Sequence, residues 1–163
     1  MEFLDTSFLQ NDEIKLVLDK FYSGNLAINW VPAYSFYICD LKGNKMGKCD
    51  LRIGYSEGLY YGGNIGYTIY EEYRGHHYSA KACKLLFELA KKHDMEYLYI
   101  TTNPDNHASN KICEYLNGEF LGIFELPEDN DMRINDKETH KSIYKFVLKE
   151  IILNGGNYAC MLF

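Results

Sequence analysis

The sequence predicts one α/β domain of the α+β type, in which a mixed, twisted sheet carries helices on both faces. Residues 65–80 combine a strand, a tight loop and the start of a helix, and an apolar strand at 97–101 follows that helix. A strand, a crossover helix and a second strand in succession place the two strands parallel. The 163 residues are enough to bury a core without disulfides or metals, and we expect residues 1–163 to form a single domain.

The first third of the chain predicts a helix and then a hairpin. Residues 11–22 mix apolar with acidic and basic side chains, and Ser23-Gly24-Asn25 closes that segment, which indicates a helix. A strand at 33–40 reaches the turn Lys42-Gly43-Asn44, and a second strand continues from there to Ile53. Because the turn is so short, we expect these two strands to pair antiparallel.

The rest of the chain alternates between helices and strands. Residues 54–63, rich in Gly and Tyr, are expected to form a loop. The helix that begins at Tyr78 has lysines along one stripe and leucines and alanines along another, as in a helix with one buried side. A second helix is expected at 106–117 and a strand at 119–125. An acid-rich loop then leads to a last strand at 143–149.

Charge and hydropathy argue against several classes of partner. The chain has 23 acidic and 17 basic residues, for a net charge of -6. It has no cluster of basic residues of the kind that binds a nucleic acid backbone. No apolar run approaches the length of a membrane span, and the first ten residues carry acids where a signal peptide would carry bases. We therefore expect a cytoplasmic protein with neither nucleic acid nor membrane as a partner.

The cysteines and histidines do not predict a metal site. Five cysteines are spread along the chain, namely Cys39, Cys49, Cys83, Cys113 and Cys160. Their number is odd and no Cys-x-x-Cys pair is present, which favours reduced thiols. His76 and His77 are adjacent, whereas two imidazoles that share a metal on a helix are four residues apart. We expect no bound metal.

The loop between the strand at Ile65–Ile69 and the following helix is a candidate anion site. Arg74-Gly75 ends the strand, and helical periodicity begins at Tyr78. The first N–H groups of a helix have no partner inside the helix, and the helix dipole adds partial positive charge there, so phosphate oxygens bind readily at such a point. The same pattern also fits a strand–helix connection that binds nothing. An unrelated nucleotide-binding module is disfavoured, because no Gly-x-x-x-x-Gly-Lys-Ser/Thr loop or dinucleotide glycine pattern is present.

These residues resemble the GNAT superfamily of acetyl-CoA-dependent N-acetyltransferases. The resemblance rests on Ile-Gly-Tyr-Thr-Ile-x-x-x-Tyr-Arg-Gly at 65–75, on the strand at 97–101 and on Asn106-x-x-Ser109 at the start of the next helix. The order of elements agrees over about residues 10–150. The resemblance implies a mostly antiparallel sheet whose central parallel strand pair is splayed apart, with acetyl-CoA as co-substrate between the two strands.

The phosphate loop departs from the family pattern at two positions. The pattern is Arg/Gln-x-x-Gly-x-Gly/Ala, and Arg74 fits its first position. His77 stands where Gly is expected, so its backbone would need an angle that usually favours glycine, although a protonated ring could attract phosphate. Ser79 replaces Gly or Ala, a milder change because a hydroxyl in the first turn can bond to phosphate or cap the helix.

The resemblance also implies which residues bind the co-substrate and which act on it. The backbone N–H of Ile69 is expected to polarise the thioester carbonyl. Cys113, seven residues after Asn106, takes the position of the tyrosine that protonates the leaving thiolate in the family, while Tyr115 is expected to face the core. The expected binding residues are Tyr67, Thr68, Ile69, Arg74, Gly75, His76, His77, Tyr78, Ser79, Asn106, Ser109 and Cys113. The candidates for the general base are Glu57, Glu71, Glu72 and His107.

The function implied is transfer of an acetyl group from acetyl-CoA to a primary amine, either a small molecule or the N-terminus or a lysine of a protein. The amine would attack the thioester directly within a ternary complex, and the enzyme could be a homodimer. A non-catalytic acyl-CoA-binding regulatory domain on the same fold is the alternative.

Overall fold

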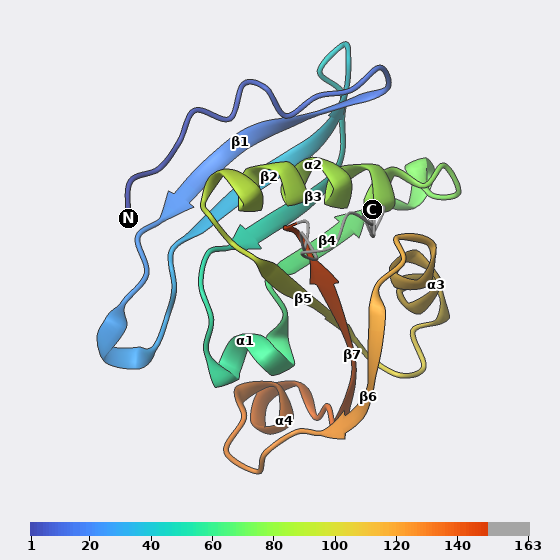
Figure 1. Cartoon of the computed structure of the whole chain (residues 1–163). Helices are drawn as coiled ribbons and strands as arrows, with labels where there is room; N and C mark the ends of the chain where they lie inside the picture. Colours follow the sequence, from blue (N-terminus) through green and yellow to red (C-terminus); the bar gives the residue numbers. More distant parts are fainter. Residues whose placement is uncertain (150–163) are drawn as a thin grey trace, which may run out of the picture.

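Two antiparallel sheets meet at an angle in the centre of the molecule (Figure 1). The computed structural model describes residues 1–149, so Cys160 and the end of the expected domain lie outside the described residues. The first sheet has the order β1-β2-β3-β4, with β1 at Ile14–Tyr22, β2 at Ala33–Asp40, β3 at Lys45–Arg52 and β4 at Ile65–Ile69. The second sheet has the order β5-β7-β6, with β5 at Tyr97–Thr102, β6 at Glu119–Glu125 and β7 at His140–Val147.

Helices pack on both sides of these sheets, as predicted. The long helix α2 crosses one face of the first sheet (Figure 1). On the opposite side of β5, Tyr60 of α1 packs against Tyr99 with ring centroids 5.2 Å apart. The α-helices are α1 at Glu57–Gly62, α2 at Tyr78–Lys92, α3 at His107–Tyr115 and α4 at Asp131–Asp136, and two short 3-10 turns lie at Leu26–Ile28 and Glu71–Tyr73. Within residues 1–149, no helix is both long and apolar enough to cross a membrane.

The helix predicted at residues 11–22 is wrong, because most of this segment is strand β1. Ile14 and Leu16 are buried while Val17 is 41% exposed, so the side chains alternate with a period of two. The strand pairs antiparallel with β2 along its whole length. The charged residues between the apolar ones resembled the polar stripe of a helix, but they lie on the exposed side of a strand.

Two segments expected to be loops contain short helices. Helix α1 lies within residues 54–63 and is capped by Ser56, whose Oγ accepts a hydrogen bond from the backbone N–H of Leu59 at 3.2 Å. Helix α4 lies within the acid-rich segment, where the side chain of Asn130 caps it in the same way. Each has only six residues, too few for a period of 3.6 to show in the sequence.

The main core lies between α2, α3 and the inner faces of the two sheets. α2 contributes Leu86 and Leu89, and β5 contributes Leu98, all fully buried. Phe87 of α2 and Phe146 of β7 are in ring contact at 5.2 Å, which ties the helix to the second sheet. This core holds α2 across both sheets, so the start of the helix is fixed next to the end of β4.

Candidate functional site

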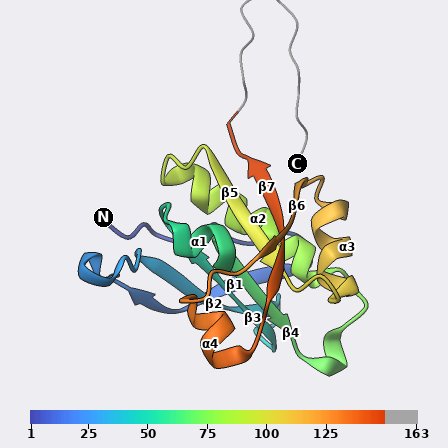
Figure 2. The same cartoon turned by 90° about the horizontal axis from the view of Figure 1, so that it is seen from below.

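The strands β4 and β5 touch at one end and then separate. The backbone N–H of Asn64 donates to the carbonyl of Tyr99 at 2.7 Å, and the Asn64 Oδ1 accepts from the Tyr99 N–H at 2.9 Å. Beyond this point the two strands belong to different sheets. Both point toward the same side of the molecule and move apart (Figure 1, Figure 2). The predicted splayed pair is therefore present, with Asn64 at its closed end.

Asn64 is fully buried and bonded on every side. Its Nδ2 donates to the carbonyls of Arg52 at 3.0 Å and of Gly54 at 2.9 Å, and its own carbonyl accepts from the Arg52 N–H at 2.8 Å. One side chain thus joins β3, β5 and the segment before α1. A buried amide with all its donors and acceptors satisfied fixes the geometry of the strands that it joins.

The edge of β4 that faces the gap carries backbone groups without ladder partners. The backbone N–H of Tyr70 donates to the carbonyl of Met46 at 2.8 Å. This bond and the register show which residues of β4 are hydrogen-bonded to β3. Because bonded and non-bonded positions alternate in an antiparallel pair, the backbone groups of Tyr67 and Ile69 point away from β3, into the gap. The carbonyl of Ile69 accepts a hydrogen bond from Arg74 Nε at 3.1 Å. The N–H of Ile69 thus faces the gap.

A cavity of about 760 Å³ opens between β4, the start of α2 and one side of α3. It contains the candidate phosphate loop at its outer part and the free edge of β4 at its inner part. The lining residues are Tyr67, Thr68, Ile69, Tyr73, Arg74, Gly75, His76, His77, Tyr78, Ser79, Asn106, Ala108, Ser109, Lys111, Ile112 and Tyr115. All the expected binding residues except Cys113 therefore lie around one cavity.

The start of α2 is built to accept an anion. His77 is the N-cap and makes no side-chain hydrogen bond to the helix, and the first bond along this helix runs from the Lys81 N–H to the His77 carbonyl at 3.1 Å. The N–H groups of Tyr78, Ser79 and Ala80 therefore lack a partner within the helix. Since His77, Tyr78 and Ser79 line the cavity, these donors and the positive end of the helix dipole lie at its wall.

His77 adopts the backbone angle that glycine would adopt. Its φ is 61° and its ψ is 23°, in the left-handed region, which costs a residue with a Cβ about 1 kcal/mol. The ring turns aside and stacks on Tyr115 with centroids 5.6 Å apart. The ring thus lies against α3, so the loop keeps its shape despite the bulky side chain.

Cations surround the same part of the cavity. Arg74 is exposed and uses its Nε to hold the Ile69 carbonyl, which leaves the other guanidinium nitrogens free to bind a ligand. Lys111 lines the opposite wall. Lys81, also near the loop, is paired with Glu13. Among residues 1–149 no group of three or more His, Cys, Asp or Glu side chains could hold a metal.

Helix α3 is tied to β4 across the floor of the cavity. Asn106 caps the helix, because its Oδ1 accepts from the Ser109 N–H at 3.1 Å. The hydroxyl of Tyr67 donates to Ser109 Oγ at 3.3 Å, and burial raises the pKa of Tyr67 well above its usual value, so that it stays a neutral donor. These bonds fix the distance between the free edge of β4 and the first turn of α3.

The predicted orientation of α3 is wrong. Cys113 is fully buried in the core and does not line the cavity, and burial raises the pKa of its thiol to about 12. Tyr115, expected in the core, is 58% exposed and lines the cavity together with Ala108 and Ile112. The reason is that the core contacts of Cys113 and Leu116 set the rotation of the helix. Leu116 lies in the core as expected, whereas Ala108, Ile112 and Tyr115 lie along the cavity wall.

The sequence also missed residues that line the cavity. Tyr73, Ala108, Lys111, Ile112 and Tyr115 were not expected there. For α3 a signal existed, since positions 108, 112 and 115 lie on one side of a helix. The four candidate bases, Glu57, Glu71, Glu72 and His107, are all outside the cavity wall.

Comparisons with known proteins agree with this geometry. The family described as "Acetyltransferase (GNAT) domain" matches residues 9–118. No curated protein sequence matches the chain. Among solved structures, the chain is similar to the microcin C7 self immunity acetyltransferase MccE in complex with acetyl-CoA and AMP, with 20% identity and a TM-score of 0.55 over 71% of this chain and 61% of that one.

Two further structures show the same fold. One is a GNAT family acetyltransferase from Bacillus anthracis, with 16% identity and a TM-score of 0.57 over 71% of this chain and 67% of that one. The other is an acetyltransferase from Salmonella typhimurium that modifies the N-terminal serine of ribosomal protein L7/L12, with 19% identity and a TM-score of 0.54 over 72% of this chain and 64% of that one. The chain thus spans less than two thirds of the MccE and Salmonella chains. Because the family match covers more than half of the sequence, the chain belongs to the GNAT acetyltransferase family.

Proposed function

We propose that the chain transfers an acetyl group from acetyl-CoA to a primary amine. One observation carries the proposal: a single cavity joins the uncapped start of α2 to the free backbone edge of β4. The first feature suits a diphosphate and the second suits an extended chain of amides, and the coenzyme contains both. The MccE structure, which holds acetyl-CoA on the same fold, supports this assignment.

Different residues of the cavity would bind different parts of the coenzyme. The N–H groups of Tyr78, Ser79 and Ala80, together with Arg74, would bind the diphosphate oxygens. The free edge of β4 would pair with the amides of the pantetheine arm, in the way that an added strand pairs with a free sheet edge. The bound arm would then lie in the gap between β4 and β5, with the thioester beside the Ile69 N–H.

The reaction is a direct transfer. The amine nitrogen attacks the thioester carbon, the carbon–sulfur bond breaks, and the sulfur leaves as a thiolate that takes up a proton. The Ile69 N–H faces the gap and would donate to the oxygen that becomes negative in the tetrahedral intermediate. Holding both reactants in one cavity lowers the entropic barrier further, and no covalent enzyme intermediate is needed.

A thermal shift experiment tests the co-substrate. Acetyl-CoA at about 100 times its dissociation constant should stabilise the native chain by about 2.7 kcal/mol, a rise in melting temperature of about 5–10 °C. ATP and NAD should raise it far less. Arg74→Ala should weaken acetyl-CoA binding about 10-fold or more, since it removes a charge-assisted hydrogen bond.

The matched control is Arg133→Ala, because Arg133 pairs with Glu125 outside the cavity and should leave the affinity for acetyl-CoA unchanged. Equal shifts with acetyl-CoA, ATP and NAD would indicate a general anion site instead. A shift with acetyl-CoA but no release of CoA thiol with any of a panel of amines would favour a binding domain without catalysis.

The proton donor to the leaving thiolate stays a prediction. We expect Cys113→Ser to act on stability, because it places a hydroxyl without a partner in the core at a cost of about 1–2 kcal/mol. Cys113→Ala should lose less, since it buries no polar group. Melting temperatures and turnover of both variants check this. A Cys113→Ser protein of native stability with turnover about 100-fold lower would instead identify Cys113 as the proton donor.

A further inference from the structure

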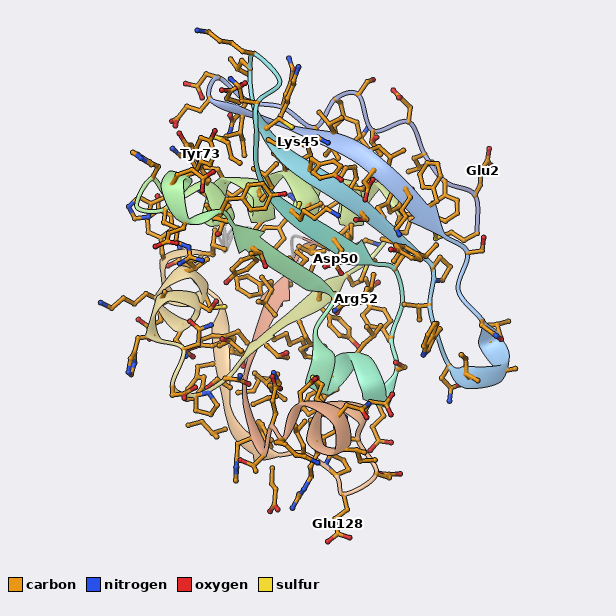
Figure 3. The ribbon with its side chains drawn as sticks, turned by 180° about the vertical axis from the view of Figure 1, so that it is seen from behind. Glu2, Lys45, Asp50, Arg52, Tyr73 and Glu128 are labelled. Atoms are coloured by element: carbon orange, nitrogen blue, oxygen red, sulfur yellow. The ribbon has the colours of Figure 1, made fainter. Side chains whose placement is uncertain are left out.

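Asp50 lies on the face of the first sheet opposite α2, next to the gap. It stands on β3 between Cys49 and Leu51, which are buried against the core, so its side chain points to the other face. Its partner across the sheet is Gly66 of β4. Figure 3 shows Asp50 together with Arg52 beside the start of β4, close to the point where β4 and β5 separate.

The absence of a side chain at Gly66 makes room for this carboxylate. A Cβ built at Gly66 would lie 2.6 Å from Asp50 Oδ1, so the oxygen lies directly over the backbone of β4. The next residue, Tyr67, turns its backbone into the gap. A strand rises about 3.3 Å per residue, and Ile69 is three residues beyond Gly66 on β4, so the carboxylate lies about 10 Å along the strand from the N–H that would bind the thioester.

One oxygen of Asp50 is held and the other is open. Arg52 binds Asp50 Oδ2 with its NH2 at 2.9 Å, and its NH1 donates to the carbonyls of Gly63 at 2.8 Å and Gly62 at 3.3 Å at the end of α1. The guanidinium therefore fixes the carboxylate in one orientation. No residue within 1–149 donates a hydrogen bond to Oδ1, and the side chain is 29% exposed, so this oxygen is open to a ligand on this face of the sheet, although Asp50 is not among the residues that line the cavity.

The surroundings of Asp50 favour proton uptake. Burial raises the pKa of the Asp50 carboxyl, and the positive charge of Arg52 lowers it by a smaller amount. The strands on either side contribute Ser35 from β2 and Gly66 from β4, neither of which titrates. Lys48, two positions away, is paired with Asp19 and lies over the ring of Tyr37.

We propose that Asp50 is the catalytic base, which receives the acceptor amine as a primary ammonium ion. This inference rests on the proposed function. Oδ1 takes one proton from the ammonium through one bridging water, which leaves a neutral amine to attack the thioester carbon. The carbon–nitrogen bond forms to give the tetrahedral intermediate, and the carbon–sulfur bond breaks when that intermediate collapses. The second proton of the nitrogen passes to the thiolate, and Asp50 returns its proton to solvent.

The test compares Asp50→Asn with Asp19→Asn. Asp19 also forms an ion pair on this sheet, at 3.4 Å from Lys48, but away from the gap. With saturating acetyl-CoA, kcat/KM for the amine is measured from pH 5.5 to 9. We expect Asp50→Asn to lower kcat/KM for the amine about 100-fold and to remove the acid limb of the pH profile. Its affinity for acetyl-CoA should be unchanged. Asp19→Asn should match the native chain.

A second variant keeps the test decisive if Asp50→Asn does not fold. Gly66→Ala keeps the carboxylate but displaces Oδ1, and should lower kcat/KM at least 10-fold with acetyl-CoA affinity retained. If Asp50→Asn keeps the acid limb of the native profile, or loses kcat/KM equally at every pH, Asp50 is not the base. The proposed function would still stand. Absence of transfer by the native chain to every amine would contradict the proposed function, and this inference with it.

Discussion

Asn64→Asp is expected to lower the melting temperature by about 8–16 °C, the largest effect of any substitution described for this chain. The carboxylate could still accept from Tyr99, but its other oxygen would face the carbonyls of Arg52 and Gly54 without a proton to donate. Two lost hydrogen bonds and the buried charge correspond to about 4 kcal/mol, and a chain of this length loses about 2–4 °C per kcal/mol.

The sign of the pH dependence distinguishes this mechanism from general damage. The introduced carboxyl is more easily protonated in the folded state than in the unfolded state, so its penalty is complete above the folded-state pKa and shrinks as the pH falls. The difference in melting temperature from the native chain should therefore be smaller at pH 5 than at pH 8. Asn117→Asp, an exposed position, is the matched control and should change the melting temperature little at either pH. A constant difference at both pH values would argue against a buried carboxylate.

Gly47→Ala is expected to destabilise the fold by about 3 kcal/mol and to weaken binding of acetyl-CoA. Gly47 lies on β3 opposite Ile69, and a Cβ there would be 2.2 Å from the backbone oxygen of Thr68. A backbone atom cannot turn away as a side chain can, so β4 must shift, at the upper end of the usual cost of overpacking. The shift would move the Ile69 N–H away from the gap.

The control for this change is Gly62→Ala. A Cβ at Gly62 at the end of α1 would meet nothing within 4 Å, so the melting temperature should stay the same or rise slightly. Thermal melting with and without acetyl-CoA measures both stability and binding for the two variants. Equal melting temperatures for Gly47→Ala and Gly62→Ala would show that β4 can move away without loss.

The sequence was informative where the spacing of apolar residues changes on either side of a loop. The strand at Ile65–Ile69 and the helix from Tyr78 were predicted at their observed starts, because alternation gives way to helical spacing on either side of Arg74-Gly75. Strand β1 was missed because its alternation is clear only over Ile14–Leu18 and is mixed with charges. Its pairing with β2, which decides its structure, is a contact between distant residues that local sequence does not show.

The part of the site that is contiguous in sequence was predicted, and the part that depends on packing or on strand register was not. The phosphate loop is contiguous in sequence, so its residues line the cavity together. The spacing on α3 showed that positions 108, 112 and 115 share one side, but not whether that side faces the core or the cavity, which depends on how Cys113 and Leu116 pack against the core. Asp50 was not predictable either, since its position beside the gap depends on the register that places it opposite Gly66.

The junction at Asn64 has a mechanical consequence. A full ladder between β4 and β5 would fix their separation at the usual strand spacing of about 4.8 Å. Here one residue joins the two strands at one end, so Asn64 fixes the point at which they separate, and the backbone groups beyond it need no ladder partner. The width of the gap is therefore set by how the two sheets pack on their shared core rather than by a ladder, and one amide side chain holds the closed end.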